Sequence, residues 1–308
     1  MKKYLNVGAD LFKNKYLYVH DYALINDKIS EKLNLDLSEL TIVYKHIPLC
    51  LNGEEHKKSR KEITNLIVSN KYIRRTMASL IKSEIKNICT PGEKDILKEF
   101  IIPLRNELLF SMLYLKDVYI PKNLPLIFNP FLGITKRQNI NNEIKKTREE
   151  IRLKFPEYDE TYISYCISIM ALAGDTLTGF IGQGLEAIFS NKNYNLDYKK
   201  KFDIPPYPII PNIYRKAVCP FKSNNREIKN GEEFIFNYDN IDMKNMKNRM
   251  LIFGSGIHTC SGRSISIMIW ELIIKELKKY DININILEYS LSSDKTIMYP
   301  NVFKIKVC

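Results

Sequence analysis

The stretch FGSGIHTCSG, residues 253–262, decides the fold of this chain, and a helical pattern follows it directly. Its glycines, Gly254, Gly256 and Gly262, predict a loop whose backbone turns tightly and comes close to a flat or bulky group. Cys260 stands just before the predicted helix, where free backbone N–H groups and the helix dipole favour a thiolate over a thiol. Cys260 is therefore a candidate metal ligand.

The surroundings of Cys260 indicate which metal site this is. No partner cysteine and no His-x-x-x-His pair lies nearby in the sequence to complete a tetrahedral zinc site. Heme iron needs only one or two protein ligands, and a cysteine thiolate pushes electron density onto the iron. The spacing thus favours a heme. The alternative is that Cys260 is a buried structural cysteine and His258 a core histidine.

The same ten residues resemble the heme-binding loop of the cytochrome P450 family, whose pattern is Phe-Gly-x-Gly-x-His/Arg-x-Cys-x-Gly. Every defined position of that pattern is present. The resemblance implies that Cys260 is the axial iron ligand, that Phe253 packs by its sulfur, and that His258 hydrogen-bonds a heme propionate. It also makes Gly254 and Gly262 cofactor-binding positions, where the loop packs under the porphyrin.

A second segment, GEEHKKSR at 53–60, resembles the His-x-x-x-Arg helix of the same family, whose two side chains reach the heme propionates. The i, i+4 spacing puts His56 and Arg60 on one helix face, as two donors to a carboxylate require. Taken alone, such a pair on a basic helix is more often a solvated face.

A third segment, ALAGDT at 171–176, lies in an otherwise apolar helical pattern and resembles the oxygen-activating segment of the family. An acid and a threonine are costly in an apolar helix unless they have a role. The resemblance makes Asp175 and Thr176 catalytic residues that relay protons to bound O2, although Ala173 stands where glycine is usual. The alternative is a helix end capped at Asp175.

A fourth segment, IYRKA at 213–217, resembles the strand whose arginine meets a heme propionate, which assigns that role to Arg215. Two family features are missing. The Glu-x-x-Arg signature would fall on Tyr198 and Lys201, and no Asn-Arg-Asp stretch follows Tyr238. The resemblance therefore implies a shortened, atypical family member.

Charge and cysteine usage exclude other classes. Lys and Arg outnumber Asp and Glu by 47 to 35, a formal charge of +12, but these lysines are spread along the chain and no nucleic-acid motif accompanies them. We therefore expect no nucleic-acid partner. The six cysteines form no Cys-x-x-Cys pair and are too sparse for a disulfide scaffold.

The overall pattern predicts a mainly α protein with small β-sheets, an α+β fold. Helical periodicity extends from about 55 to 195, with short strand-like runs at 203–240 and near the C-terminus. No composition break separates domains, so we expect one heme-thiolate domain over 1–308 without a separate reductase domain. No signal-peptide core and no run of about 18 apolar residues occurs, which predicts a cytoplasmic protein without a membrane span.

Together these expectations describe a heme-thiolate monooxygenase or oxidase that binds heme b and acts on a small organic, specialised-metabolite substrate. It would use O2 and electrons from a ferredoxin or flavodoxin, because the chain has no flavin or iron–sulfur segment. Two alternatives stay open: a peroxide-driven or redox-neutral heme enzyme, and a degenerate member that binds heme or a partner protein without catalysis.

Overall fold

The computed structural model describes residues 3–5, 17–18, 21–121, 124–129, 131–190, 208–223, 226–237, 250–254, 256–280, 283–292 and 297–308. Helices dominate these residues. The α-helices are α1 (Tyr22–Leu33), α2 (Ser38–Tyr44), α3 (Gly53–Ser69), α4 (Ile73–Ile88), α5 (Ile102–Leu113), α6 (Ile134–Lys154), α7 (Glu160–Ser190) and α9 (Arg263–Leu277). Short helical turns are η2 (Pro48–Cys50), η3 (Leu97–Ile101), η4 (Leu124–Phe128), η6 (Met250–Phe253) and η7 (Gly256–His258).

The strands of these ranges form three small sheets. They are β1 (Lys3–Leu5), β2 (Leu17–Tyr18), β3 (Gly92–Asp95), β4 (Asn212–Ala217), β5 (Phe221–Ser223), β6 (Arg226–Ile228), β7 (Glu233–Asn237), β8 (Ile284–Leu291) and β9 (Pro300–Val307). The sheet orders are β1-β7-β4-β2, β3-β9-β8 and β5-β6, and β1–β7 is a parallel pair. Small sheets beside a helical body confirm the predicted fold class.

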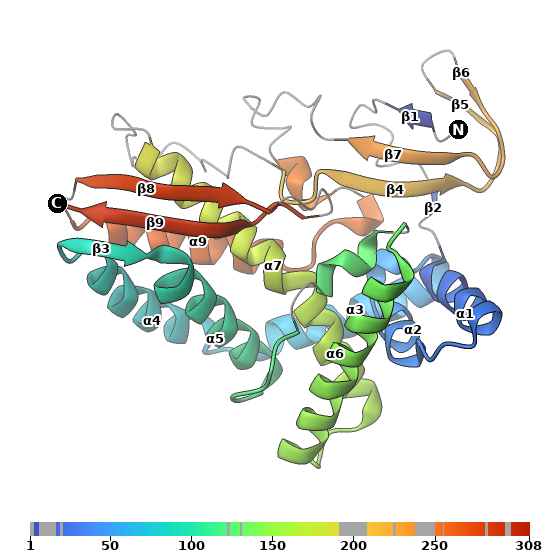
Figure 1. The fold of residues 1–308 in the computed structure, drawn as a ribbon, viewed down its shortest axis with the longest axis horizontal. Coiled ribbons are helices and arrows are strands. Elements are labelled where there is room, and N and C mark those ends of the chain that lie inside the picture. The colour runs from blue at the N-terminus through green and yellow to red at the C-terminus, as the bar shows by residue number, and fades with distance from the viewer. Residues whose placement is uncertain are drawn as a thin grey trace.

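The two larger sheets lie toward opposite ends of the molecule, and the helices fill the space between and beneath them (Figure 1). Helices α4 and α5 lie under the sheet that contains the C-terminal strand β9, while α1, α2 and α6 gather at the other end. Helix α7 runs obliquely through the middle. Residues of α3, α7, α9 and the loop before α9 line one cavity.

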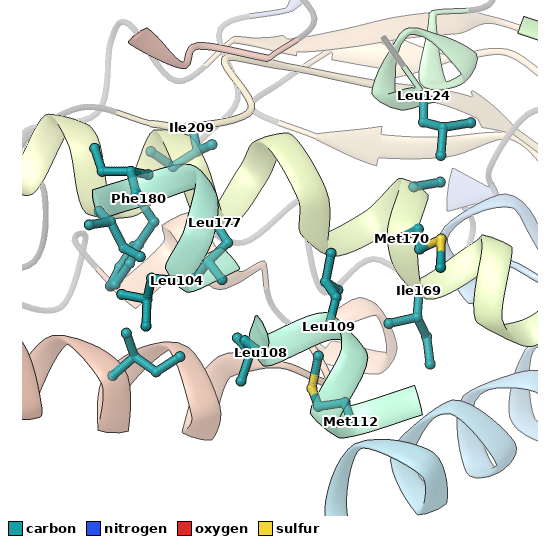
Figure 2. Close-up of a cluster of buried hydrophobic side chains, with 14 of the residues drawn as sticks. Leu104, Leu108, Leu109, Met112, Leu124, Ile169, Met170, Leu177, Phe180 and Ile209 are labelled. Atoms are coloured by element: carbon teal, nitrogen blue, oxygen red, sulfur yellow. The ribbon is translucent and has the colours of Figure 1, made fainter. Parts of the chain in front are cut away.

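Helix α7 forms the centre because its sequence is apolar nearly all round. Twenty of its residues are buried, and α5 packs against one side of it through Leu104, Leu108 and Met112 (Figure 2). Its most apolar window is long enough to cross a membrane by composition, but 78% of that window is buried inside the protein. A helix in a protein core can be as apolar on all sides as a membrane-spanning helix, so composition alone does not distinguish the two.

Three glycines let other elements touch the backbone of α7. A Cβ at Gly179 would overlap the Met298 carbonyl oxygen, and one at Gly184 would overlap the Trp270 ring of α9. A Cβ at Gly182 would overlap Pro300, at the start of β9. Close packing on both sides therefore fixes where α9 and the start of β9 lie along α7.

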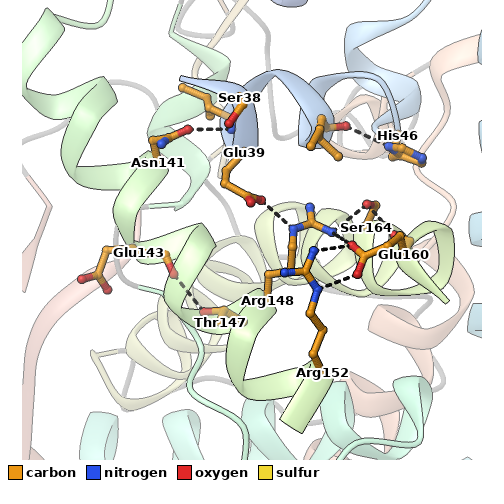
Figure 3. Close-up of polar contacts among 12 residues, drawn as sticks. Ser38, Glu39, His46, Asn141, Glu143, Thr147, Arg148, Arg152, Glu160 and Ser164 are labelled. Carbon is orange, nitrogen blue, oxygen red and sulfur yellow. Dashed lines mark hydrogen bonds and ion pairs between the residues drawn. The ribbon is translucent and has the colours of Figure 1, made fainter. Parts of the chain in front are cut away.

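At the other end of the molecule, a buried arginine joins three helices. The guanidinium of Arg148 on α6 donates from Nε to Glu39 of α2 at 2.6 Å and from a terminal nitrogen to Glu160 of α7 at 3.2 Å (Figure 3). It also donates to the hydroxyl of Ser164 at 3.1 Å. Only 1% of the Arg148 side chain is exposed, so these acceptors compensate a charge that water cannot reach.

We expect Arg148→Ala to lower the free energy of unfolding by about 3 kcal/mol, because it leaves the mostly buried Glu39 carboxylate without its cation. Arg152→Ala is the matched control. Arg152 pairs with the same Glu160 at 2.5 Å, but both side chains are half exposed, so the expected loss is below about 1 kcal/mol. Denaturant unfolding measures both values, and equal losses would contradict a special role for Arg148.

A pair of glycine substitutions tests the packing of α7. We expect Gly184→Ala to destabilise the protein by about 2 kcal/mol, because the rigid indole of Trp270 cannot yield to a methyl group. Gly174→Ala in the same helix meets no atom within 4 Å and should stabilise by about 1 kcal/mol through helix propensity. Thermal and denaturant unfolding give the two signs, and a stabilising Gly184→Ala would refute this packing.

Candidate functional site

The loop before α9 is held in shape by its own backbone. The N–H of Cys260 donates to the carbonyl of Phe253 at 2.6 Å, and the N–H of Gly254 donates to Leu251 at 2.8 Å. The N–H of Thr259 donates to Gly256 at 3.2 Å. Because these bonds fold the loop back on itself, the backbone of Cys260 lies directly beside that of Phe253, seven residues earlier in the sequence.

Gly254 is required by this geometry. Its φ is +71°, a left-handed conformation that side chains rarely adopt, and an added Cβ would lie 2.8 Å from the carbonyl oxygen of His258. Gly262, at the entrance to α9, has φ −83° and would bring a Cβ only to 3.8 Å from the Cys260 sulfur. Only the first of these glycines is therefore demanded by the loop itself.

Cys260 lines a cavity and is exposed to it. Burial raises the pKa of the thiol above its ordinary value, whereas the backbone N–H of Gly262 and the charge of Arg60 act in the opposite direction. The N–H of Arg263 also points to the sulfur. Backbone donors and the charges of Arg60 and Arg263 thus favour an anionic sulfur, the form in which a cysteine binds a metal ion.

Two imidazoles meet at one edge of this cavity. The rings of His56, on α3, and His258, in the loop, lie with centroids 4.6 Å apart at an interplanar angle of 68°. Burial and the charge of Arg215 lower the pKa of His258 to about 3, and burial also lowers that of His56. Both rings are therefore neutral at ordinary pH.

Each imidazole keeps one buried nitrogen, Nε2 of His56 and Nδ1 of His258, that no protein group among the described residues satisfies. Buried polar atoms rarely remain without a partner. Arg60 lines the same cavity, and the charge of Arg215 lowers the pKa of both imidazoles. A ligand with carboxylates at this edge would satisfy the nitrogens and balance the arginines, so these residues fit a group such as heme with its propionates.

Arg60 and Arg215 are placed differently. Arg60 donates to the carbonyl of Thr259 at 2.5 Å and lines the cavity. Arg215, on β4, is buried and donates to the carbonyl of Tyr214 at 2.7 Å, but it is not among the described residues that line the cavity. Arg215 therefore acts on the two imidazoles through its charge without lining the cavity.

The ALAGDT segment lies within α7, which continues unbroken to Ser190, so the alternative of a helix end capped at Asp175 is wrong. Thr176 lines the cavity with Cys260, and its hydroxyl donates to the carbonyl of Leu172 at 2.5 Å. Asp175 faces elsewhere. It lines a second cavity and pairs with Arg105 of α5 at 3.4 Å, and burial raises its pKa. The side chains of Asp175 and Thr176 point in different directions because successive residues of an α-helix are rotated by about 100° around its axis.

Aromatic side chains pack the loop onto α7 and α9. The ring centroid of Phe253 lies 5.8 Å from that of Phe180 on α7, which in turn lies 6.0 Å from that of Trp270 on α9. Phe253 and Phe180 also line the cavity. These ring contacts therefore fix Phe253 relative to α7 and α9. The carbonyl of Phe253 accepts the hydrogen bond from the Cys260 N–H.

Sequence reasoning missed the apolar walls of the cavity. They come from α3, α5, α7, the segment before β4 and β4 itself: Ile63, Ile67, Leu108, Met112, Ile169, Leu172, Leu177, Phe180, Ile209 and Ile213. A signal existed on two helices, since Ile63 and Ile67 continue the face of His56 and Arg60, and Phe180 continues that of Thr176. Nothing in the sequence pointed to α5. The positions of the missing Glu-x-x-Arg pair, Tyr198 and Lys201, and the segment after Tyr238 lie outside the described residues.

No protein-family model and no curated protein sequence matches this chain. Solved structures do. P450BioI, in complex with acyl carrier protein ligated to hexadec-9Z-enoic acid, superposes with a TM-score of 0.74 at 13% identity, covering 97% of this chain and 89% of that one. The bacillaene synthase cytochrome P450 PksS of Bacillus subtilis 168 gives 0.71 at 14% identity, with coverages of 96% and 87%. CYP109B1, a versatile cytochrome P450 enzyme from Bacillus subtilis, gives 0.64 at 14% identity, with coverages of 85% and 86%.

This chain has the cytochrome P450 fold. The predicted P450-like architecture is confirmed. Within that fold, the structure brings Cys260, His56, His258, Arg60 and Thr176 to one cavity, as the sequence interpretation requires. It places Asp175 in a second cavity, and Arg215 does not line the first. The individual roles of these residues in a P450 fold remain predictions.

Two glycine variants test the loop of this P450 fold. We expect Gly254→Ala to lower the free energy of unfolding by about 2 kcal/mol, since a left-handed φ and a backbone overlap combine there. Gly262→Ala should change it by less than about 0.5 kcal/mol, because its Cβ makes only an ordinary contact. Denaturant titration of the cofactor-free chain measures both. Similar values for the two variants would mean that the loop is not held as described.

Proposed function

We propose that this chain is a heme-thiolate oxidoreductase of the cytochrome P450 type. One observation carries the proposal: Cys260 and two imidazoles, each with a buried nitrogen that has no partner among the described residues, line a single, otherwise largely apolar cavity. Cys260 would bind the iron of heme b, while His56, His258 and Arg60 would hold the propionates, with Arg215 acting through its charge. When bound, the heme would supply oxygen activation for oxidation of an organic substrate.

The chain's own residues would prepare the sulfur for this task. The N–H groups of Gly262 and Arg263 point at the Cys260 sulfur and favour its anionic form. Phe253 packs against Phe180 of α7, and its carbonyl accepts the hydrogen bond from the Cys260 N–H. The backbone that carries the sulfur would thereby be held in place for the iron.

Thr176 is the cavity residue suited to handling a proton. Its hydroxyl donates to the Leu172 carbonyl, so its oxygen can still accept a hydrogen bond from a group in the cavity. A rotation of the side chain would let the same hydroxyl donate into the cavity. Asp175 would have to leave Arg105 before it could act in the same relay.

From the apolar walls of the cavity we propose a small, partly apolar substrate, of the kind found in specialised metabolism. Aliphatic side chains such as Ile169, Leu172 and Ile209 line the cavity and offer no hydrogen bonds. Binding would therefore depend on shape and on exclusion of water. The enzyme would discriminate substrates mainly by size.

An electron donor is the second proposed partner. The formal charge of +12 suits an acidic carrier such as a ferredoxin or flavodoxin, which a basic surface would steer toward it. Lys57 on α3, Arg263 at the start of α9 and Ile257 in the loop before it are all exposed and would be available to such a donor. We place this single-domain enzyme in the cytoplasm, with no nucleic-acid partner.

A second candidate is a peroxide-driven or redox-neutral heme enzyme. It is favoured by the position of Asp175, whose carboxylate pairs with Arg105 and faces a different cavity. Peroxide brings the oxygen already reduced, so such an enzyme would need less of a proton relay. Turnover with peroxide, compared with turnover with a reductase couple, separates the two candidates.

The decisive experiment is a spectrum of the reduced, heme-supplied chain with carbon monoxide. We expect a Soret band shifted far to the red of a histidine-ligated heme, and we expect Cys260→Ala and Cys260→Ser to abolish it. Cys89→Ala, a buried cysteine outside the cavity, is the control. Quenching of the fluorescence of Trp270, the chain's one tryptophan, reports heme binding whether or not Cys260 is the iron ligand. Quenching without the shifted band would leave only a degenerate heme-binding protein.

Thr176→Ala tests the proton relay. We expect at least about a tenfold loss of reductase-driven turnover coupled to product, with peroxide-driven turnover retained, because the proton donor is lost. Thr178→Ala removes the same hydroxyl and methyl groups from a side of α7 that contacts Arg105 instead of the cavity. It should leave the coupling of turnover to product unchanged. Product formed per O2 consumed is the measurement. Unchanged coupling in Thr176→Ala would refute the relay.

A further inference from the structure

The peptide unit between Thr259 and Cys260 is held at both ends. Its carbonyl oxygen accepts a hydrogen bond at 2.5 Å from the guanidinium of Arg60, which lies 199 residues away in the sequence. Its N–H donates to the carbonyl of Phe253 at 2.6 Å. The orientation of this one peptide fixes the N–Cα bond of Cys260, so that only the rotation φ about that bond remains to direct the side chain.

We infer that Arg60 is a positioning residue for the Cys260 sulfur, which it orients through the Thr259 carbonyl before any cofactor binds. The inference rests on the proposed function, since it takes Cys260 as the metal ligand. It adds to the propionate role of Arg60 a second role that needs no heme. The loop and α3 would thus form a prepared site.

The chemistry of a guanidinium allows both roles at once. Arginine carries five N–H donors in a planar fork, so one donor on the Thr259 carbonyl leaves others for an anion in the cavity. A hydrogen bond from a charged donor is about twice as strong as a neutral one. It also polarises the peptide, which strengthens the bond from the Cys260 N–H to Phe253.

The base of this clamp is rigid. On α3 the residue before Arg60, Ser59, is buried and its hydroxyl donates to the carbonyl of His46 at 2.5 Å. One turn further along, Ile63 is almost fully buried. Arg60 therefore extends from a fixed helix toward a loop that contains two glycines with positive φ, Gly254 at +71° and Gly256 at +64°. Such a loop has other conformations available unless a long-range contact selects one.

Hydrogen exchange of the cofactor-free chain tests the inference. Arg60→Met keeps the length and packing of the stem but removes every donor. We expect the peptide that contains 253–262 to exchange about tenfold faster, the factor for losing one charge-assisted bond. A peptide from β9 should exchange as in the wild type, which shows that the effect is local. Lys61→Met, an exposed neighbour with the same loss of charge, should leave the loop unchanged.

Further variants keep the test decisive. Arg60→Lys retains charge and a donor without the fork, so its loop should exchange at a rate between the wild type and Arg60→Met. If Arg60→Met fails to fold, Arg60→Leu replaces it, because leucine also carries no hydrogen-bond donor. Loop exchange equal to that of the wild type in the folded donor-free variant would overturn the inference, even if heme affinity fell. Loss of the carbon monoxide band in the wild type would instead defeat the proposed function.

Discussion

Close packing against the backbone of α7 is the constraint on which the rest of the structure depends. Gly179 and Gly184 admit the Met298 carbonyl and the Trp270 ring, so the start of β9 and helix α9 are fixed at one height along α7. The loop that carries Cys260 leads directly into α9. Through Phe180 and Phe253, the same helix also contacts the loop itself. The position of the Cys260 sulfur along the axis of α7 therefore follows from the packing of α9 and the loop against α7.

A concentration of positive charge is the second organising feature. Arg60 and Arg215 lie near two imidazoles that burial keeps neutral, and each imidazole retains a nitrogen without a partner in the part of the chain that the structure describes. Such an arrangement is unfavourable in a cofactor-free chain, because burial without a hydrogen-bond partner costs free energy. It becomes favourable when an anionic group enters. Cofactor binding and stability of this end of the cavity are thus physically coupled.

The contrast between two arginines shows how the protein treats buried charge. Arg148 meets carboxylates from two other helices, and its charge is compensated within the protein. Arg60 meets a neutral carbonyl oxygen, and its charge remains available to a ligand. Arg148 joins helices far from the cavity, whereas Arg60 joins a helix to the loop that holds the candidate iron ligand. Among the described residues, Arg148 thus has carboxylate partners that join helices, whereas Arg60 has none and lines the cavity.

The sequence by itself determined the helical character of the chain, the P450-like fold and the residues of the Cys260 loop, because periodicity and a dense local motif are properties of neighbouring residues. The continuation of a helix face also predicted that His56 lies with Arg60. Tertiary structure alone decided that Asp175 turns to Arg105 while Thr176 faces the cavity, since that depends on where α5 packs. It alone decided that Arg60 reaches the Thr259 carbonyl, 199 residues away. Contacts between distant segments arise from packing of whole elements, and no local pattern records them.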